Sequence, residues 1–181
     1  MPPQSNAFVQ PLWRHVATAT FARVSIAPRA QEAREIDKLF RAGDATLAMQ
    51  RVDKAIADKP RDAALRFQRA VMLAELGRAS DAMAALNALI EDFPDLPEPY
   101  NNLAVLLAAQ GRIDRARELL ETALRYNPGY AVAHENLGDV YIRLAQREFD
   151  RAGAAGRSGE ALQRKLTLTR EMVAASQPAR P

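Results

Sequence analysis

The chain of 181 residues contains no cysteine, and its only histidines are His15 and His134. The absence of cysteine excludes disulfides, thiol catalysis and cysteine-ligated zinc, and it is compatible with either a reducing or an oxidising compartment. Histidine is the usual acid–base group near neutral pH, so two isolated histidines offer little for catalysis. No apolar run approaches the roughly 20 residues that span a bilayer, so the sequence predicts no transmembrane segment.

Motifs of catalysis and of cofactor binding are missing as well. The sequence has no Gly-rich phosphate loop and no HExxH-type pair of metal ligands. Glu135 and Asp139 would lie one helical turn apart, but no histidine or third carboxylate accompanies them at helical spacing, so we interpret them as a solvated pair. We therefore predict a protein that is not an enzyme, with no catalytic residue, no metal site and no cofactor.

Acidic residues are absent from the start of the chain. Residues 1–31 carry three arginines and no acid, and residues 151–181 carry six basic residues against two acidic ones. The whole chain has a formal charge of +3, which leaves a charge of −4 for residues 32–150. A phosphate backbone would be repelled by that acidic middle region. We therefore expect no nucleic-acid partner.

What the sequence does contain is a pair of helical patterns in residues 97–128. Two stripes of apolar residues at helical spacing are separated by Gly111, which can take the left-handed conformation that ends a helix. Pro97 suits the first turn of a helix, with Asp95 nearby as a cap, and Pro128 stops the second helix. The pattern predicts a helical hairpin.

The hairpin alternates bulky and small residues and recurs along the chain, with Pro60, Pro94 and Pro128 spaced by 34 residues. In these features it resembles the tetratricopeptide repeat, which has bulky residues at its fourth, seventh and eleventh positions, small ones at the eighth, twentieth and twenty-seventh, and proline at the thirty-second. Counted from Pro97, the residues at these positions are Tyr100, Leu103, Leu107, Ala104, Ala116, Ala123 and Pro128. His134 occupies the fourth position of the next repeat, where the family places a ring for packing.

The resemblance covers roughly residues 30–145 and implies an all-α fold, a right-handed α-solenoid of about three to four helical hairpins. Three closely spaced glycines after residue 151 disfavour a regular second helix in the fourth repeat, so we expect a C-terminal capping helix instead. The predicted helices are 31–42, 45–58, 62–76, 79–92, 97–110, 113–126, 131–151 and 160–174.

We divide the chain accordingly into a poorly ordered basic segment (1–30), a solenoid (31–151), a capping-helix region (152–174) and a disordered tail (175–181). The first segment lacks the basic start and long apolar run of a secretory signal, and a degenerate targeting segment is the alternative. The cytoplasm is therefore the default compartment, and the periplasm would follow if the start site is misassigned.

The resemblance further implies a concave groove, lined by the first helix of each repeat, in which the protein binds a peptide or partner segment as a non-enzymatic scaffold. Carboxylates outnumber arginines at the groove positions, so we expect a partner with basic residues beside apolar ones. The expected groove residues are Phe67, Gln68, Val71, Asn101, Asn102, Val105, Glu135, Asn136, Asp139 and Arg143.

Amides recur at one groove position, the sixth of each repeat: Gln68, Asn102 and Asn136. A primary amide both donates and accepts hydrogen bonds, so such a row can hold an extended peptide backbone. The structural alternative is local solvation or hydrogen bonding between helices.

An alternative to the scaffold is a structural or self-associating subunit. In that case the groove is filled by another copy of the chain, with a homo-oligomer as the consequence, or by the chain's own N-terminal segment. That segment supplies basic and apolar residues of the expected kind at Trp13, Arg14, Phe21 and Arg23.

Overall fold

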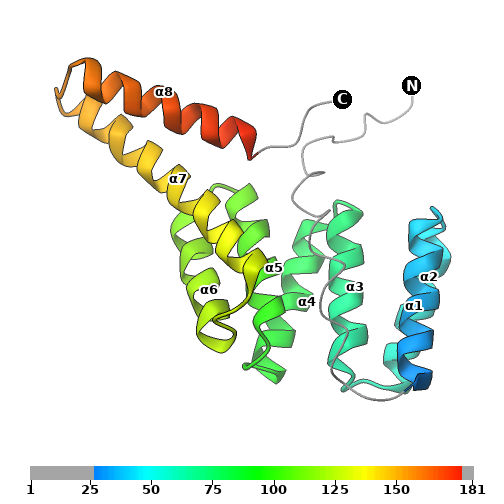
Figure 1. The fold of residues 1–181 in the computed structure, drawn as a ribbon. Helices are drawn as coiled ribbons and strands as arrows, with labels where there is room; N and C mark the ends of the chain where they lie inside the picture. Colours follow the sequence, from blue (N-terminus) through cyan, green and yellow to red (C-terminus); the bar gives the residue numbers. More distant parts are fainter. Residues whose placement is uncertain (1–26, 177–181) are drawn as a thin grey trace, which may run out of the picture.

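The structure is a computed structural model that describes residues 27–176, and all regular secondary structure in this range is helical. The helices are α1 (Ala27–Arg41), α2 (Ala45–Asp58), α3 (Ala63–Glu75), α4 (Ala79–Asp92), α5 (Pro97–Ala109), α6 (Ile113–Tyr126), α7 (Ala131–Ala154) and α8 (Glu160–Ala175), as Figure 1 shows. The predicted helix ranges are confirmed to within a few residues. None of these helices is long and apolar enough to cross a membrane.

The two ends of the chain were expected to be poorly ordered, and most of both lies outside the described residues. Helix α1 begins at Ala27, four residues before the predicted start of the first helix. Helix α8 ends at Ala175, one residue later than predicted. The expectation for residues 1–26 and 177–181 therefore stays a prediction.

The turn inside each hairpin depends on a glycine in the left-handed region. Gly111 has a φ of +77°, and its N–H donates to the carbonyl of Ala108 at 3.0 Å. The next N–H, of Arg112, donates to the carbonyl of Leu107 at 2.9 Å, so the last carbonyls of α5 are satisfied. Gly43 and Gly77 adopt the same conformation at the equivalent positions. The predicted cap at Asp95 is wrong: the N-cap residue of α5 is Leu96, with no side-chain cap.

Replacing Gly111 with alanine should lower the free energy of unfolding by about 1 kcal/mol, because an L-residue pays a steric cost at positive φ. The matched control is Gly138→Ala in the interior of α7, where an added Cβ meets nothing within 4 Å. That control should raise stability by about 0.5–1 kcal/mol, because alanine is the better helix former. Urea unfolding followed by circular dichroism measures both. Equal effects of the two changes would contradict the turn geometry described here.

The hairpins stack so that each helix packs on its predecessor and the odd-numbered helices form an inner row. Helices α3 and α4 pair, as do α5 and α6, and α4 packs on α5 in between. Direct contacts link α1 to α3 and α5 to α7 within the inner row, and α4 joins α3 to α5. The predicted α-solenoid is confirmed.

The core follows the alternation of large and small residues. Ala82, Ala104 and Ala116 are fully buried where helices cross, and large residues such as Leu86 and Leu120 fill the space beside them. Two hydrophobic clusters result, one within α1–α3 and one from α3 to α7, and Met49 packs against both. Such close packing at native density is what fixes the register of the stacked repeats.

The second repeat has arginines at two positions where the repeat pattern expects bulky residues. Arg66 forms an ion pair with Asp92 at 2.7 Å and lies over the ring of Phe93, 5.6 Å from its centroid. Arg69 forms an ion pair with Asp53 at 2.6 Å. Both side chains therefore reach a flanking outer helix, Arg66 on α4 and Arg69 on α2.

Helix α7 continues past the point where the earlier repeats turn, because Ala145 stands where they have glycine. Gly156 and Gly159, both at positive φ, then reverse the chain, and α8 returns along the second half of α7 (Figure 1). Arg170 pairs with Asp150 at 3.2 Å across this hairpin.

The predicted C-terminal helix is therefore present, but only one of its apolar stripes is covered. Leu162 and Leu166 are buried, whereas Leu168 and Met172 are 58% and 50% exposed. A capping helix was expected here, and full capping would cover all four of these side chains. The difference arises because α7 is the principal neighbour of α8 and can cover only one side of it.

Candidate functional site

The residues expected to line a groove all lie on the inner helices α3, α5 and α7, and we call this set the inner face. Its members are Phe67, Gln68 and Val71 on α3, Asn101, Asn102 and Val105 on α5, and Glu135, Asn136, Asp139 and Arg143 on α7. The amide-bearing part is largely buried, with Asn101 and Asn102 only 0% and 1% exposed. Of these residues, Glu135 alone is exposed.

Hydrogen bonds between amides connect successive helices of the inner row. Gln68 Nε2 donates to the carbonyl of Ala33 on α1 at 2.8 Å. Asn136 Nδ2 on α7 donates to Asn101 Oδ1 on α5 at 2.9 Å, and Asn101 Nδ2 donates to Asn102 Oδ1 at 3.1 Å. Hydrogen bonding between helices, which was the structural alternative for this row, is therefore part of the role of these side chains.

Two atoms of the same row keep unused hydrogen-bonding capacity. The acceptor Gln68 Oε1 and the donor Asn102 Nδ2 are buried and have no hydrogen-bond partner among residues 27–176. A buried polar atom without a partner costs about 1–3 kcal/mol, so such atoms are rare in native structures. Here one acceptor and one donor lie at the same repeat position on neighbouring inner helices, the combination that complements a backbone N–H and C=O.

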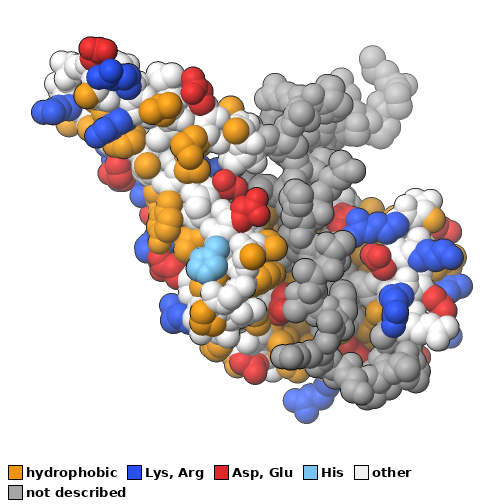
Figure 2. All heavy atoms as spheres, viewed as in Figure 1, with side chains coloured by type: hydrophobic (Ala, Val, Ile, Leu, Met, Phe, Trp, Pro, Cys, Tyr) orange, Lys and Arg blue, Asp and Glu red, His pale blue; other side chains and the backbone are white. Residues whose placement is uncertain are grey.

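Carboxylates on the inner face and beside it lack direct ion pairs. Glu98, Glu135 and Asp139 form no ion pair with the described residues. Burial raises the pKa of Asp139, and Glu135 one turn away raises it further, although Arg143 opposes the shift. Burial, with a contribution from Glu98, raises the pKa of Tyr130 to about 12. Figure 2 shows acidic side chains beside hydrophobic ones over the first half of α7.

Glu75, towards the α1 end of the inner row, is a second carboxylate whose pKa burial raises. Its pKa is raised chiefly by burial, even though Arg41 Nη2 lies 3.7 Å from Glu75 Oε1. The cation is itself shared with Asp37, 3.4 Å away. Two carboxylates, Glu75 and Asp37, therefore share the one guanidinium group of Arg41.

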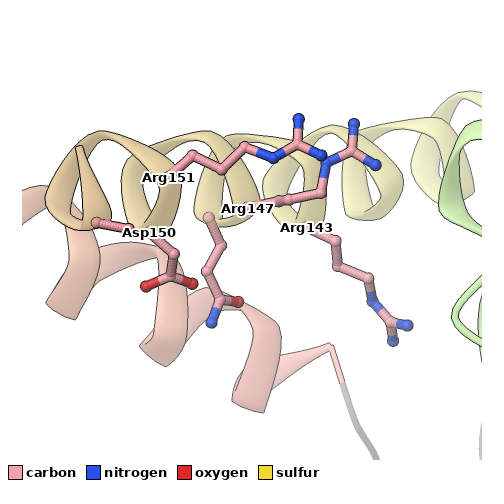
Figure 3. Close-up of a pocket in the computed structure, with 6 residues that line it drawn as sticks. Arg143, Arg147, Asp150 and Arg151 are labelled. Atoms are coloured by element: carbon pink, nitrogen blue, oxygen red, sulfur yellow. The ribbon is translucent and has the colours of Figure 1, made fainter.

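A depression of about 460 Å³ lies beside α7, lined by three arginines one turn apart and shown in Figure 3. Each arginine already has partners. Arg143 donates to the carbonyl of Ala108 at 3.2 Å, and Arg151 pairs with Glu148 at 2.8 Å. Arg147 holds both carboxylate oxygens of Asp114 on α6, at 2.5 and 3.0 Å. The Arg147–Asp114 pair fixes α7 against α6, and Arg147 and Arg151 are both paired with carboxylates.

The Arg147–Asp114 pair is the main side-chain contact that the sequence analysis missed. The hydrogen bond from Arg147 holds the pKa of Asp114 below its usual value, and Asp114 in turn raises the pKa of Arg147. The two residues are 33 positions apart, close to the 34-residue period, so they occupy nearly equivalent places in successive repeats. That spacing was the signal in the sequence that could have indicated the Arg147–Asp114 pair.

His134 has a structural contact, in line with its predicted packing role. Its Nε2 lies 2.9 Å from the carbonyl oxygen of Pro128, and because a carbonyl only accepts, the ring nitrogen donates. Tyr100, at the same position one repeat earlier, donates its hydroxyl to the carbonyl of Pro94 at 2.8 Å. In these two repeats the side chain at the fourth position therefore bonds to the proline turn that precedes it. Within residues 27–176 no group of three or more acidic or histidine side chains could hold a metal ion.

Comparison with known proteins places these features in a family. The sequence profile of the tetratricopeptide repeat matches residues 39–106 and 107–155. A 73-residue segment is 40% identical to the TPR repeat-containing thioredoxin TTL4 of Arabidopsis thaliana, and it covers 40% of this chain but only 11% of that protein.

Solved structures agree on the fold. A thermophilic TPR protein from Thermus thermophilus superposes with a TM-score of 0.58 at 23% identity, over 77% of this chain and 80% of its own. The second TPR domain of human RPAP3, solved in complex with the HSP70 peptide SGPTIEEVD, superposes with a TM-score of 0.54 at 19% identity, over 61% and 92% of the two chains. Because the family profile covers more than half of the sequence, the chain belongs to the tetratricopeptide repeat family.

Proposed function

We propose that this chain is a non-enzymatic protein-interaction scaffold that binds an extended segment of a partner protein along its inner face. The observation that carries the proposal is the unpaired acceptor of Gln68 and the unpaired donor of Asn102, at the same repeat position on α3 and α5. Helix α4 packs on both α3 and α5, so these two helices lie at most two helix spacings apart, about 20 Å. An extended peptide advances about 3.3 Å per residue, so a peptide of about six residues could meet both amides with its backbone groups.

The charge of the inner face indicates which peptides would fit. The human RPAP3 domain that this chain resembles was solved with a peptide that ends in EEVD. An acidic peptide of that kind would meet Glu98, Glu135 and Asp139, which lack ion pairs with the described residues, and like charges disfavour association. We infer instead a partner segment with lysine or arginine beside apolar residues, whose apolar side chains would pack on half-buried Phe67 and Val71.

A random peptide display library, selected against the immobilised full chain, tests this function. We expect selected peptides to be rich in basic and apolar residues. The selected peptide should bind the double variant Glu135→Gln/Asp139→Asn about fivefold to tenfold more weakly at low salt, because two attractive charges at a partly desolvated site are lost. Asn102→Leu should weaken binding by about threefold to tenfold, the scale of one hydrogen bond. Titration calorimetry gives both ratios.

Matched controls lie on the outer helices. Glu91→Gln/Glu118→Gln removes the same charge from α4 and α6, where both carboxylates are exposed, and Asn87→Leu removes an exposed amide from α4. These variants should bind the selected peptide like the parent. If the outer variants weaken binding as much as the inner ones, or if acidic peptides are selected, the proposal is wrong.

A further inference from the structure

The inner face has a candidate occupant within the chain itself. Residues 8–26 read FVQPLWRHVATATFARVSI and contain two arginines, no acid and several large apolar side chains. We propose that this stretch, which we call the N-terminal stretch, binds in cis along the inner face and competes there with the partner segment. The inference rests on the proposed function, because it assigns a second, internal ligand to the same surface.

Charge complementarity is the first argument. Arg14 and Arg23 are the charged side chains of the N-terminal stretch apart from His15, and nothing in residues 1–26 offsets them. Opposite them, the inner face presents Glu135 and Asp139 one turn apart on α7, without an ion pair to the described residues. One of these two guanidinium groups can reach the pair of carboxylates, and such a contact steers association as well as stabilises it.

Hydrogen bonding and apolar burial point to an extended segment. Asn102 Nδ2 and Gln68 Oε1 are buried without a partner among residues 27–176, and a backbone laid across α3 and α5 would supply one acceptor and one donor. Trp13 and Phe21 give the stretch two aromatic anchors, the kind of side chain that dominates binding energy in buried interfaces.

The connection is short enough to make binding in cis effective. The N-terminal stretch joins α1 at Ala27, and the carbonyl of Ala33, about 9 Å further along that helix, already accepts a hydrogen bond from Gln68. The contacts run from α3 through α4 and α5 to α7, so α3 and α7 lie at most three helix spacings apart, about 30 Å. A total of about 40 Å needs about twelve extended residues, and 26 precede α1. A tether of this length gives a local concentration in the millimolar range.

Hydrogen exchange on the full chain tests the contact. In the parent protein, backbone amides of residues 8–26 should exchange at least tenfold more slowly than in the double variant Arg14→Glu/Arg23→Glu. The matched control is Arg61→Glu/Arg157→Glu, which changes the net charge equally at two exposed positions away from the inner face. That control should keep the slow exchange. The proposal is overturned if, in the parent protein, the amides of residues 8–26 exchange as fast as those of a free peptide.

A competition experiment separates binding in cis from other occupants. A fluorescent synthetic peptide of residues 5–26 should bind the Arg14→Glu/Arg23→Glu chain at least tenfold more tightly than the parent, because the internal competitor is weakened. Equal affinities of the two chains for the peptide overturn the proposal. Slow exchange that develops only when light scattering detects a dimer also overturns it, because the inner face would then be occupied by a second copy.

The experiments give different results if this inference fails and if the proposed function fails. If library-selected peptides bind while residues 8–26 exchange freely, the partner site stands and the internal ligand is rejected. If the synthetic peptide binds but no library peptide does, the internal contact stands and the chain is a self-contained subunit, so the scaffold function is rejected.

Discussion

Replacing Leu120 with alanine should lower the free energy of unfolding by about 2–5 kcal/mol, the range for deleting a buried leucine side chain from a packed core. Leu120 is 1% exposed and belongs to the large hydrophobic cluster formed from α3 to α7. In a stack of repeats each unit contacts only its neighbours, so a cavity in α6 weakens its contacts with both α5 and α7.

The control for this prediction is the same substitution at a residue that the structure leaves in water. Leu168→Ala on α8 removes a side chain that is 58% exposed and should change stability by less than about 0.5 kcal/mol. Urea unfolding at a common slope compares the two variants. A cost at Leu168 that matches the cost at Leu120 would mean that α8 packs elsewhere than along α7.

Local sequence signals were sufficient for the hairpins. Gly111 predicted the end of α5 because only glycine takes a φ of +77° without a steric penalty. Ala104 and Ala116 predicted the helix crossings, and both are fully buried there. Even the missing turn in α7 follows from a single residue, because Ala145 replaces the glycine that would have ended the helix. These features depend on residues close in sequence, and a repeat presents them several times.

Contacts that depend on two distant side chains were not predictable in the same way. The Arg147–Asp114 pair joins residues on different helices, and neither residue is unusual at its own position. The position of α8 was predicted only in part, because the side of α8 that α7 covers is set by the Gly156 and Gly159 turn and not by the amphipathic pattern of α8 itself.

The candidate site could be predicted from the sequence only in part. The 34-residue period placed Gln68, Asn102 and Asn136 in one row, which is a property of the repeat. It could not indicate that Asn101 would join the row and bond to both neighbouring asparagines, because position five of the other repeats carries no amide in the described helices. Burial of these amides makes their structural contribution large enough to measure.

Asn101→Leu should therefore lower the free energy of unfolding by about 2–3 kcal/mol, although leucine has the same branched shape and number of side-chain heavy atoms as asparagine and is more apolar. The substitution removes the acceptor of Asn136 Nδ2 and the donor to Asn102 Oδ1, and the second of these groups is fully buried. A buried polar group that loses its partner costs about 1–3 kcal/mol, more than the hydrogen bond itself contributes.

The decisive comparison is with the triple variant in which Asn101, Asn102 and Asn136 are all leucine. If the cost of the single change comes from stranded polar groups, removing those groups as well should restore most of the lost stability, so that the triple variant unfolds at higher urea concentration than Asn101→Leu. The same triple variant should lose affinity for an inner-face peptide, because Asn102 Nδ2 is the donor that we assign to the ligand. Additive destabilisation with unchanged affinity would mean that the amides serve only to join α5 to α7.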